Sequence, residues 1–199
     1  MLPCADAHLP VLPLWIDGHA CLTVTPAFGI VRRSCDGQAL RRIPLCGQAE
    51  VARAQASARS ALPGWARTSE GERREVLLQL TTLVEAYHSH FVALLAEESG
   101  LGTSGSAAEL AAVLEGLRSP LRVDAVEVTA SVAEIDSPFA GALQQAIPVL
   151  AAGGAAIVVT APTAPSALVA FAELTGRCGV PSGVFNLLHG DASIRAMLA

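Results

Sequence analysis

The fold class of this chain follows from residues 142–190, which read ALQQAIPVLAAGGAAIVVTAPTAPSALVAFAELTGRCGVPSGVFNLLHG. Their hydrophobic pattern predicts two helices and two strands in alternation: a helix over about 139–151, a strand over 155–160, a helix over 165–177 and a strand over 183–188. Both strands are nearly continuous apolar runs, as in parallel strands that helices cover on both faces. A strand, a helix and a second strand form the βαβ unit of a parallel sheet. We therefore expect an α/β fold with a three-layer, Rossmann-like parallel sheet flanked by helices.

The region before this stretch is predicted to add a small antiparallel hairpin element and several helices. Residues 12–47 read as short strands, with turn signals at Asp17-Gly18 and at Cys35–Gln38. We expect a tail over 1–11 and one domain over 12–199. That domain divides into hairpins, helices and a βαβ portion, over 12–47, 48–118 and 119–199.

Helix start and stop signals divide the middle of the chain. An Ala-rich helix is predicted over 48–62, with Pro63-Gly64 as its stop. Capping boxes at Ser69–Glu72 and Ser106–Glu109 predict one helix that ends at Gly100 and another that ends near Leu117. Alternating residues over 122–133 predict a half-exposed strand, and a last helix is expected to open at Asp191.

Composition excludes several functional classes. The 199 residues are 52% hydrophobic and 16% charged, which excludes disorder for most of the chain. The net charge of −5 is opposite in sign to a nucleic-acid-binding surface, so no nucleic-acid partner is expected. All 13 basic residues are Arg, which excludes chemistry that depends on a Lys amine.

Cysteine usage and apolar segments predict a cytoplasmic protein outside the membrane. The five cysteines are scattered without a CxxC pair, which fits a reducing compartment. The first residues lack the basic region of a signal peptide. The uncharged stretch between Asp136 and Glu173 is long enough to span a bilayer, but Pro148 and Gly153-Gly154 favour buried core instead.

Two long motifs resemble the NAD(P)-dependent aldehyde dehydrogenase superfamily. Residues 142–190 resemble the family's pattern "apALaaGN.vVlKPsE.tP.sa..laela...GlP.GV.N.v.G". Trp15-Ile16-Asp17-Gly18 resembles the family's "yIdG", and residues 61–100 resemble "aFp.Wa.ts..eR..iL...a.ll......la.l...E.Gk". The motifs stand in the family's order over about residues 12–191. The chain thus resembles the N-terminal half of these enzymes, with the first portion of their cofactor domain.

The resemblance also shows where this chain departs from the family's chemistry. The family's "PWNFP" window falls on residues 134–138, and Asp136 occupies the position of the oxyanion-stabilising Asn. A carboxylate repels an oxyanion, whereas an amide donates a hydrogen bond to it. Val159 and Pro162 occupy the positions of the Lys and Glu that hold the adenosine ribose, and neither side chain forms hydrogen bonds. The family's catalytic Cys and Glu belong to the part of its sequence that follows this region, so no catalytic residue is assigned here.

The remaining candidates are better explained as structural residues. Asp136 also fits a helix N-cap. Cys178 fits an inert buried thiol. His88 and His90 stand two residues apart on a helix and face different directions, so no metal site is expected. His189 ends a strand at an edge that can host ligands, although the family varies at this position.

These residues lead to three functional hypotheses. The first is a non-catalytic aldehyde-dehydrogenase-like protein that acts as a structural or interaction module and binds no cofactor. The alternative is a subunit of a split NAD(P)-dependent aldehyde dehydrogenase, in which another chain supplies Cys and Glu. A nucleotide-sensing module is the third, and the missing ribose anchors count against it. We also expect a homodimer or a protein partner that covers an open sheet edge after the strand at 183–188.

Overall fold

The computed structural model describes residues 8–23, 27–123, 127–132, 137–160, 162–190 and 192–198. The strands are β1 (Leu14–Ile16), β2 (His19–Cys21), β3 (Phe28–Arg32), β4 (Ala39–Pro44), β5 (Val128–Val132), β6 (Ala155–Thr160) and β7 (Phe185–His189). The helices are α1 (Gln48–Arg67), α2 (Glu70–Ala86), α3 (His88–Ser99), α4 (Gly102–Arg118), α5 (Ala140–Ala152), α6 (Pro165–Arg177) and α7 (Ala192–Leu198).

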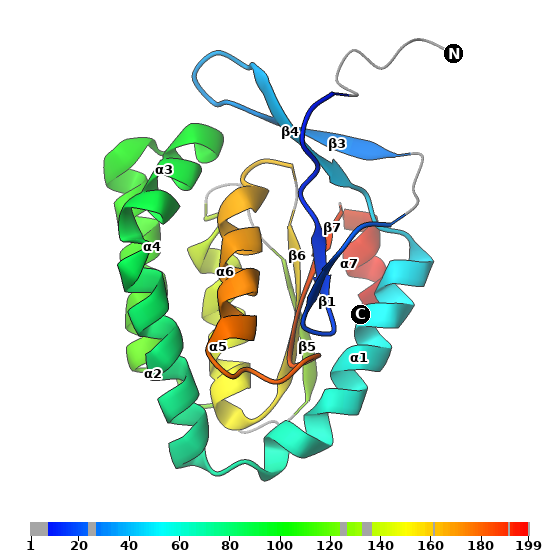
Figure 1. The fold of residues 1–199 in the computed structure, drawn as a ribbon, viewed down its shortest axis with the longest axis vertical. Coiled ribbons are helices and arrows are strands. Elements are labelled where there is room, and N and C mark those ends of the chain that lie inside the picture. The colour runs from blue at the N-terminus through cyan, green and yellow to red at the C-terminus, as the bar shows by residue number, and fades with distance from the viewer. Residues whose placement is uncertain are drawn as a thin grey trace.

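The centre of the molecule is a five-stranded sheet in the order β2-β1-β7-β6-β5 (Figure 1). Strands β5, β6 and β7 are parallel, with β6 in the middle, and every residue of β6 is buried. This arrangement confirms the predicted α/β fold with its parallel sheet and apolar strands. The predicted hairpins are present as the antiparallel pairs β1–β2 and β3–β4.

Helices cover both faces of this sheet. Alternate residues of β6 belong to two apolar clusters: Ala156 and Val158 to one, and Ile157 and Val159 to the other. The first cluster lies under α5 and α6, with α2, α3 and α4 packed outside them (Figure 1). The second lies under α1 and α7. The period-2 alternation of a strand thus supplies both faces of a three-layer core.

The prediction of an open edge after the strand at 183–188 is wrong. Strand β1 pairs antiparallel with β7, and Trp15 stands opposite Leu187. The Asp17 amide also donates to Oδ1 of Asn186, at 3.1 Å. The N-terminal hairpin therefore takes the edge of a strand that follows it by about 170 residues in sequence. Local patterns carry no information on such a distant pairing, and the outer strands of the sheet are β2 and β5.

Helix α1 does not stop at Pro63-Gly64 as predicted but continues to Arg67. A proline inside a helix removes one backbone hydrogen bond, and that loss has to be offset by packing. Here the offset is Trp65, which is buried in the main apolar cluster and donates from Nε1 to the Leu150 carbonyl at 2.8 Å. A tertiary contact therefore keeps the last turn of α1 helical.

Two other helix predictions need correction. The helix expected from Ser69 to Gly100 is divided at Tyr87 into α2 and α3, although the Ser69–Glu72 capping box is present. The Ser106–Glu109 box does not form, because α4 begins earlier, at Gly102. Glu109 instead contacts the start of α5. Among the described residues, no helix is both long and apolar enough to cross a membrane.

Candidate functional site

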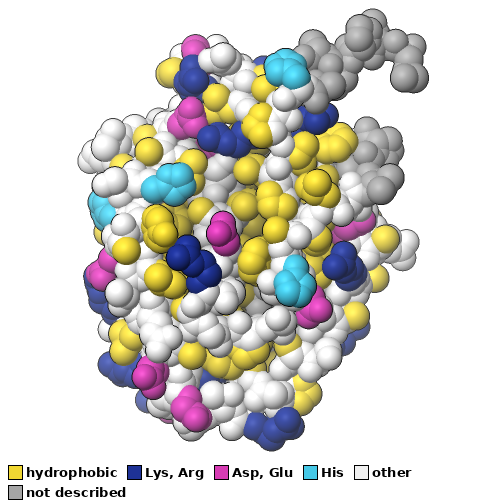
Figure 2. All heavy atoms as spheres, in the orientation of Figure 1, with side chains coloured by type: hydrophobic (Ala, Val, Ile, Leu, Met, Phe, Trp, Pro, Cys, Tyr) yellow, Lys and Arg dark blue, Asp and Glu magenta, His cyan; other side chains and the backbone are white. Residues whose placement is uncertain are grey.

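The carboxyl ends of β5, β6 and β7 meet at one edge of the sheet, where ligands bind in open α/β folds. The β3–β4 hairpin lies across this edge, at the top of Figure 1. Just after the hairpin, the Cys46 amide donates to the carbonyl of His189, the last residue of β7, at 2.9 Å. In the space-filling view of the same face, apolar side chains gather below the hairpin (Figure 2). The hairpin therefore covers part of the candidate cofactor edge.

Val159 and Pro162 lie at this edge and present no polar group to it. Val159 is only 1% exposed and packs in the apolar cluster shared with α1. Pro162, just after β6, lies so close to Gly29 of β3 that a Cβ atom on Gly29 would stand 2.7 Å from its Cγ. Asp136, which the resemblance predicts at the family's oxyanion position, lies outside the described residues.

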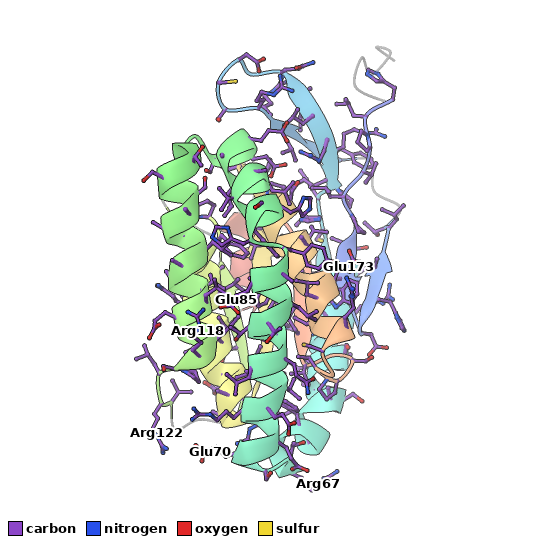
Figure 3. The ribbon with its side chains drawn as sticks, turned by 60° about the vertical axis from the view of Figure 1, so that its left-hand side comes forward. Arg67, Glu70, Glu85, Arg118, Arg122 and Glu173 are labelled. Carbon is purple, nitrogen blue, oxygen red and sulfur yellow. The ribbon has the colours of Figure 1, made fainter. Side chains whose placement is uncertain are left out.

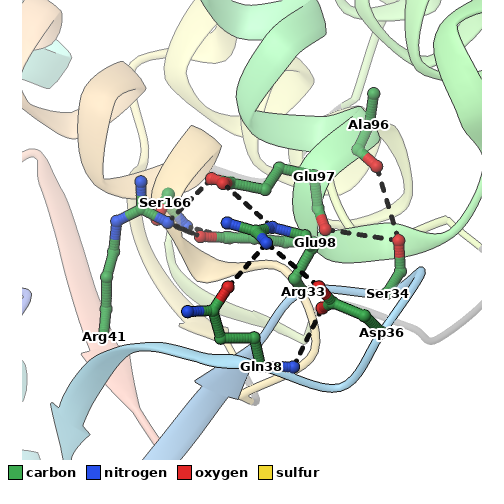
Figure 4. A network of polar contacts seen from close by, with 9 residues as sticks. All are labelled: Arg33, Ser34, Asp36, Gln38, Arg41, Ala96, Glu97, Glu98 and Ser166. Atoms are coloured by element: carbon green, nitrogen blue, oxygen red, sulfur yellow. Dashed lines mark hydrogen bonds and ion pairs between the residues drawn. The ribbon is translucent and has the colours of Figure 1, made fainter.

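The N-terminus of α6 is occupied by the carboxylate of Glu98, from the end of α3. The Ser166 amide donates to Glu98 Oε2 at 3.1 Å, and the Ser166 hydroxyl donates to Oε1 at 2.5 Å. Arg41 of β4 forms an ion pair with the same carboxylate at 2.7 Å (Figure 4). Helix N-termini attract anions because their free amides and dipole carry partial positive charge. Glu98 supplies that anion from within the chain.

Burial sets the electrostatics of this contact. The pKa of the Glu98 carboxyl lies above its ordinary value because burial removes the group from water. The Ser166 hydrogen bonds and the Arg41 charge lower this pKa and offset part of the increase. Glu97 and Arg33 extend the network toward solvent, with an ion pair of 3.7 Å between them (Figure 4). The network joins the β3–β4 hairpin to α3 and α6, and it fixes the hairpin in place over the carboxyl ends of the strands.

The N-terminus of α5 is capped in the same way by Glu109, from α4. Its Oε2 accepts hydrogen bonds from the amides of Phe139 at 3.1 Å and Ala140 at 2.9 Å. Its Oε1 accepts a hydrogen bond from the Ser137 hydroxyl at 2.8 Å. The two helices that follow β5 and β6 thus each hold a carboxylate of this chain at the N-terminus, where the helix dipole favours an anion.

Sequence reasoning missed the roles of Glu98 and Glu109. Glu98 lies 68 residues from Ser166, and Glu109 lies 31 residues from Ala140. The local motif at Glu109 even indicated a different bond, to the start of its own helix. An acidic residue near a helix end was the signal, but its partner could not be read from the sequence.

His189 is fully buried at the end of β7. Its Nε2 lies 2.9 Å from the Pro13 carbonyl, and its Nδ1 has no hydrogen-bond partner among the described residues. Burial lowers the pKa of His189 to about 4, so the imidazole is neutral at physiological pH. The ring faces the start of β1, which gives it a structural role at the β1–β7 contact.

The thiols of Cys21, Cys46 and Cys178 are not activated as nucleophiles. Cys178 is buried, as predicted, and burial raises its pKa. Burial also raises the pKa of Cys21, and that of Cys46 to about 12. His88 and His90 are exposed on α3. Across the described residues, no group of three His, Cys, Asp or Glu side chains is arranged to hold a metal ion.

The fold and this edge define a Rossmann-like α/β domain, and comparison with known proteins gives its family. The model of the aldehyde dehydrogenase family matches residues 26–123 and 121–199. The chain therefore belongs to the aldehyde dehydrogenase family, as the two sequence motifs indicated.

Solved structures of this family share the fold. A 1-pyrroline-5-carboxylate dehydrogenase mutant of Thermus thermophilus is 20% identical, with a TM-score of 0.86 over 96% of this chain and 41% of its own. A mutant of aldehyde dehydrogenase C of Pseudomonas syringae, solved with NAD+ and octanal, is 24% identical, with a TM-score of 0.86 over 93% of this chain and 42% of its own. Lactaldehyde dehydrogenase of Escherichia coli is 23% identical, with a TM-score of 0.85 over 96% of this chain and 45% of its own. The chain thus spans less than half the length of these relatives.

Proposed function

We propose that this chain is a non-catalytic aldehyde-dehydrogenase-like module with a structural or interaction role in the cytoplasm. The observation that carries the proposal is the pair Val159 and Pro162, which stand where the family's ribose-binding Lys and Glu would be. Val159 is buried in the core, and Pro162 lies against Gly29 of the hairpin. Ribose hydroxyls would have to leave water without gaining a side-chain partner at either position, and this disfavours NAD(P) binding.

The remaining chemistry of the chain supports the same proposal. Asp136 places a carboxylate at the sequence position of the oxyanion-stabilising Asn. A cysteine nucleophile needs a depressed pKa, whereas the pKa values of Cys21, Cys46 and Cys178 are raised by burial. These features disfavour aldehyde oxidation by this chain on its own.

Calorimetry tests the proposal directly. NAD+ and NADP+ are titrated separately into the purified chain, with aldehyde dehydrogenase C of Pseudomonas syringae as a positive control for NAD+. We expect no binding heat from this chain at millimolar cofactor. Micromolar binding, or NAD(P)H production from an aldehyde by the chain alone, would overturn the proposal.

A split enzyme is the second candidate, and the β5 edge favours it. Within the described residues β5 pairs only with β6, and α7 crosses the sheet from the end of β7 to contact β5. A further parallel strand fits that edge, in line with a chain that spans 41–45% of its relatives. The partner would carry the family's Cys and Glu, and NAD(P) would bind only in the complex.

Affinity purification of the tagged chain from its own cells separates these two readings. A split enzyme requires a co-purified chain of the same family and NAD(P)H production by the complex. A structural module gives a homodimer or a different protein partner, without that activity. A chain that stays monomeric at high concentration and retains no partner would contradict both.

A further inference from the structure

A pocket of about 540 Å³ lies at the opposite end of the sheet from the candidate cofactor edge. It is enclosed by the first turns of α2, the ends of α4 and α5, and residues 119–123. Because α5 ends at Ala152 and β6 begins at Ala155, the pocket lies near the amino ends of the strands. Its volume is within the range of small-molecule sites. Neither proposed function uses it.

The pocket is basic on an acidic protein. Four guanidinium groups line it, from Arg73, Arg74, Arg118 and Arg122, against one carboxylate, from Glu70. Glu85 adds a second carboxylate through its ion pair with Arg118. Figure 3 shows Glu70, Arg118 and Arg122 toward the same end of the molecule. A local excess of positive charge on a chain of net charge −5 favours an anionic ligand.

Two of the four arginines are engaged by the protein itself. Arg73 is buried and donates from Nε to the Ala151 carbonyl at 2.8 Å and from Nη1 to the Thr68 carbonyl. It thereby balances the negative end of α5. Arg118 lies in the last turn of α4, where it balances that helix dipole and pairs with Glu85.

The other two arginines remain available to a ligand. Arg74 is exposed and makes no hydrogen bond or ion pair with the described part of the chain. Arg122 lies 3.4 Å from Glu70, but their side chains are 91% and 76% exposed. Such an exposed ion pair contributes little to the stability of the fold. A ligand anion can therefore replace Glu70 as the partner of Arg122 at a small cost in free energy.

Most of the remaining side chains that line the pocket are apolar. Leu77, Leu117 and Pro148 contribute a buried floor. Leu121 lines the pocket with 75% of its surface exposed. A floor of this kind beside two exposed guanidinium groups fits a molecule with an anionic head and an apolar body. Guanidinium groups pair well with both carboxylate and phosphate.

We propose that this pocket binds a small amphipathic anion, a carboxylate or phosphate on a short apolar chain. Arg74 and Arg122 contact the head, and Leu121 contacts the body above the buried floor. The test is calorimetry on the full chain at low salt with four probes: hexanoate, hexyl phosphate, 1-hexanol and inorganic phosphate. We expect one of the two amphipathic anions to bind with a Kd at or below about 1 mM, and the one that binds tighter identifies the head group. Both 1-hexanol and inorganic phosphate should bind at least about tenfold more weakly.

Matched variants locate the binding. Arg74→Gln should weaken binding of the anion about tenfold. Arg59→Gln removes the same charge from an exposed position on α1 and should leave the binding affinity unchanged. Leu121→Ser should weaken binding of the anion severalfold. Leu22→Ser changes a residue that is 66% exposed outside the pocket, and it should leave the binding affinity unchanged.

Three results would overturn the proposal. They are no binding of either amphipathic anion at millimolar concentration, equal binding of 1-hexanol, and equal losses in Arg74→Gln and Arg59→Gln. Because the pocket is distant from Val159 and Pro162, none of these results bears on NAD(P) binding.

Discussion

The two ends of the central sheet use charge in opposite ways. At the carboxyl end, Glu98 and Glu109 of the chain itself occupy the helix N-termini, and Pro162 lies under the hairpin. At the amino end, Arg74 and Arg122 remain in excess beside an apolar pocket. In this family member, the end where α/β folds usually bind ligands is held together by internal contacts. The other end carries exposed arginines with few internal contacts, so the two ends should respond differently to mutation.

The largest expected effect is at Glu98. Glu98→Ala leaves Arg41 and the Ser166 amide without their buried partner, and we expect a loss of about 3–5 kcal/mol in the free energy of unfolding. Glu97→Ala, at the neighbouring residue that pairs with Arg33 and Arg41 nearer solvent, should lose no more than about 1 kcal/mol. Urea denaturation followed by circular dichroism measures both. Equal losses would show that the buried carboxylate has no special role.

The next effect is a pH dependence from His189. Its folded pKa of about 4 lies below the ordinary 6.5, so the unfolded chain binds more protons between these values. Stability should therefore rise with pH from about 4 to 6.5, by about 3 kcal/mol for this residue, and change little from it above pH 7. Urea denaturation at several pH values measures the slope.

A matched pair assigns that slope to His189. In His189→Gln the free energy of unfolding should rise much less between about pH 4 and 6.5. His88→Gln changes an exposed histidine and should show the same rise as the unmodified chain. A slope that survives in His189→Gln would place its source in other groups.

A smaller effect is expected at Glu109. Glu109→Ala removes the cap of α5, and we expect a loss of about 1–2 kcal/mol. Glu115→Ala serves as the control, because it removes an exposed carboxylate from the same helix. Thermal unfolding compares the two proteins. Indistinguishable melting temperatures would mean that α5 does not depend on this carboxylate.

The smallest effect is expected at the amino end. Arg74→Gln should change the free energy of unfolding by less than about 0.5 kcal/mol, because Arg74 has no partner among the described residues. The same denaturation assay measures it. A loss as large as that of Glu98→Ala would make Arg74 a structural residue and remove the contrast between the two ends.

Much of the fold could be predicted because its signals are local. The strand at 155–160 and the helix at 165–177 have the predicted bounds, since an apolar run between a Gly pair and a Pro is read from neighbouring residues. The hairpin turns at Asp17-Gly18 and Cys35–Gln38 were predicted for the same reason. The positions of Val159 and Pro162 were assigned by resemblance, and the structure adds what each of them touches.

Other features depend on contacts that no local pattern encodes. The pair Pro63-Gly64 predicts a helix stop, but α1 continues because Trp65 donates a hydrogen bond to the Leu150 carbonyl. These two residues are 85 positions apart, so no local pattern indicates the bond. The Ser106–Glu109 box was predicted because its spacing is right, yet the carboxylate of Glu109 serves another helix.

The sequence alone determined the α/β class, the family and the buried strands, and it placed Val159 and Pro162 at and just after the end of a strand. Those properties reside in residue identity and short-range periodicity. Only the tertiary structure decided that β1 covers β7, that Glu98 and Glu109 cap α6 and α5, and that arginines from α2 and from the segment after α4 share a pocket. These depend on how elements far apart in sequence pack together, because burial and hydrogen-bond satisfaction are settled only when the whole chain has folded.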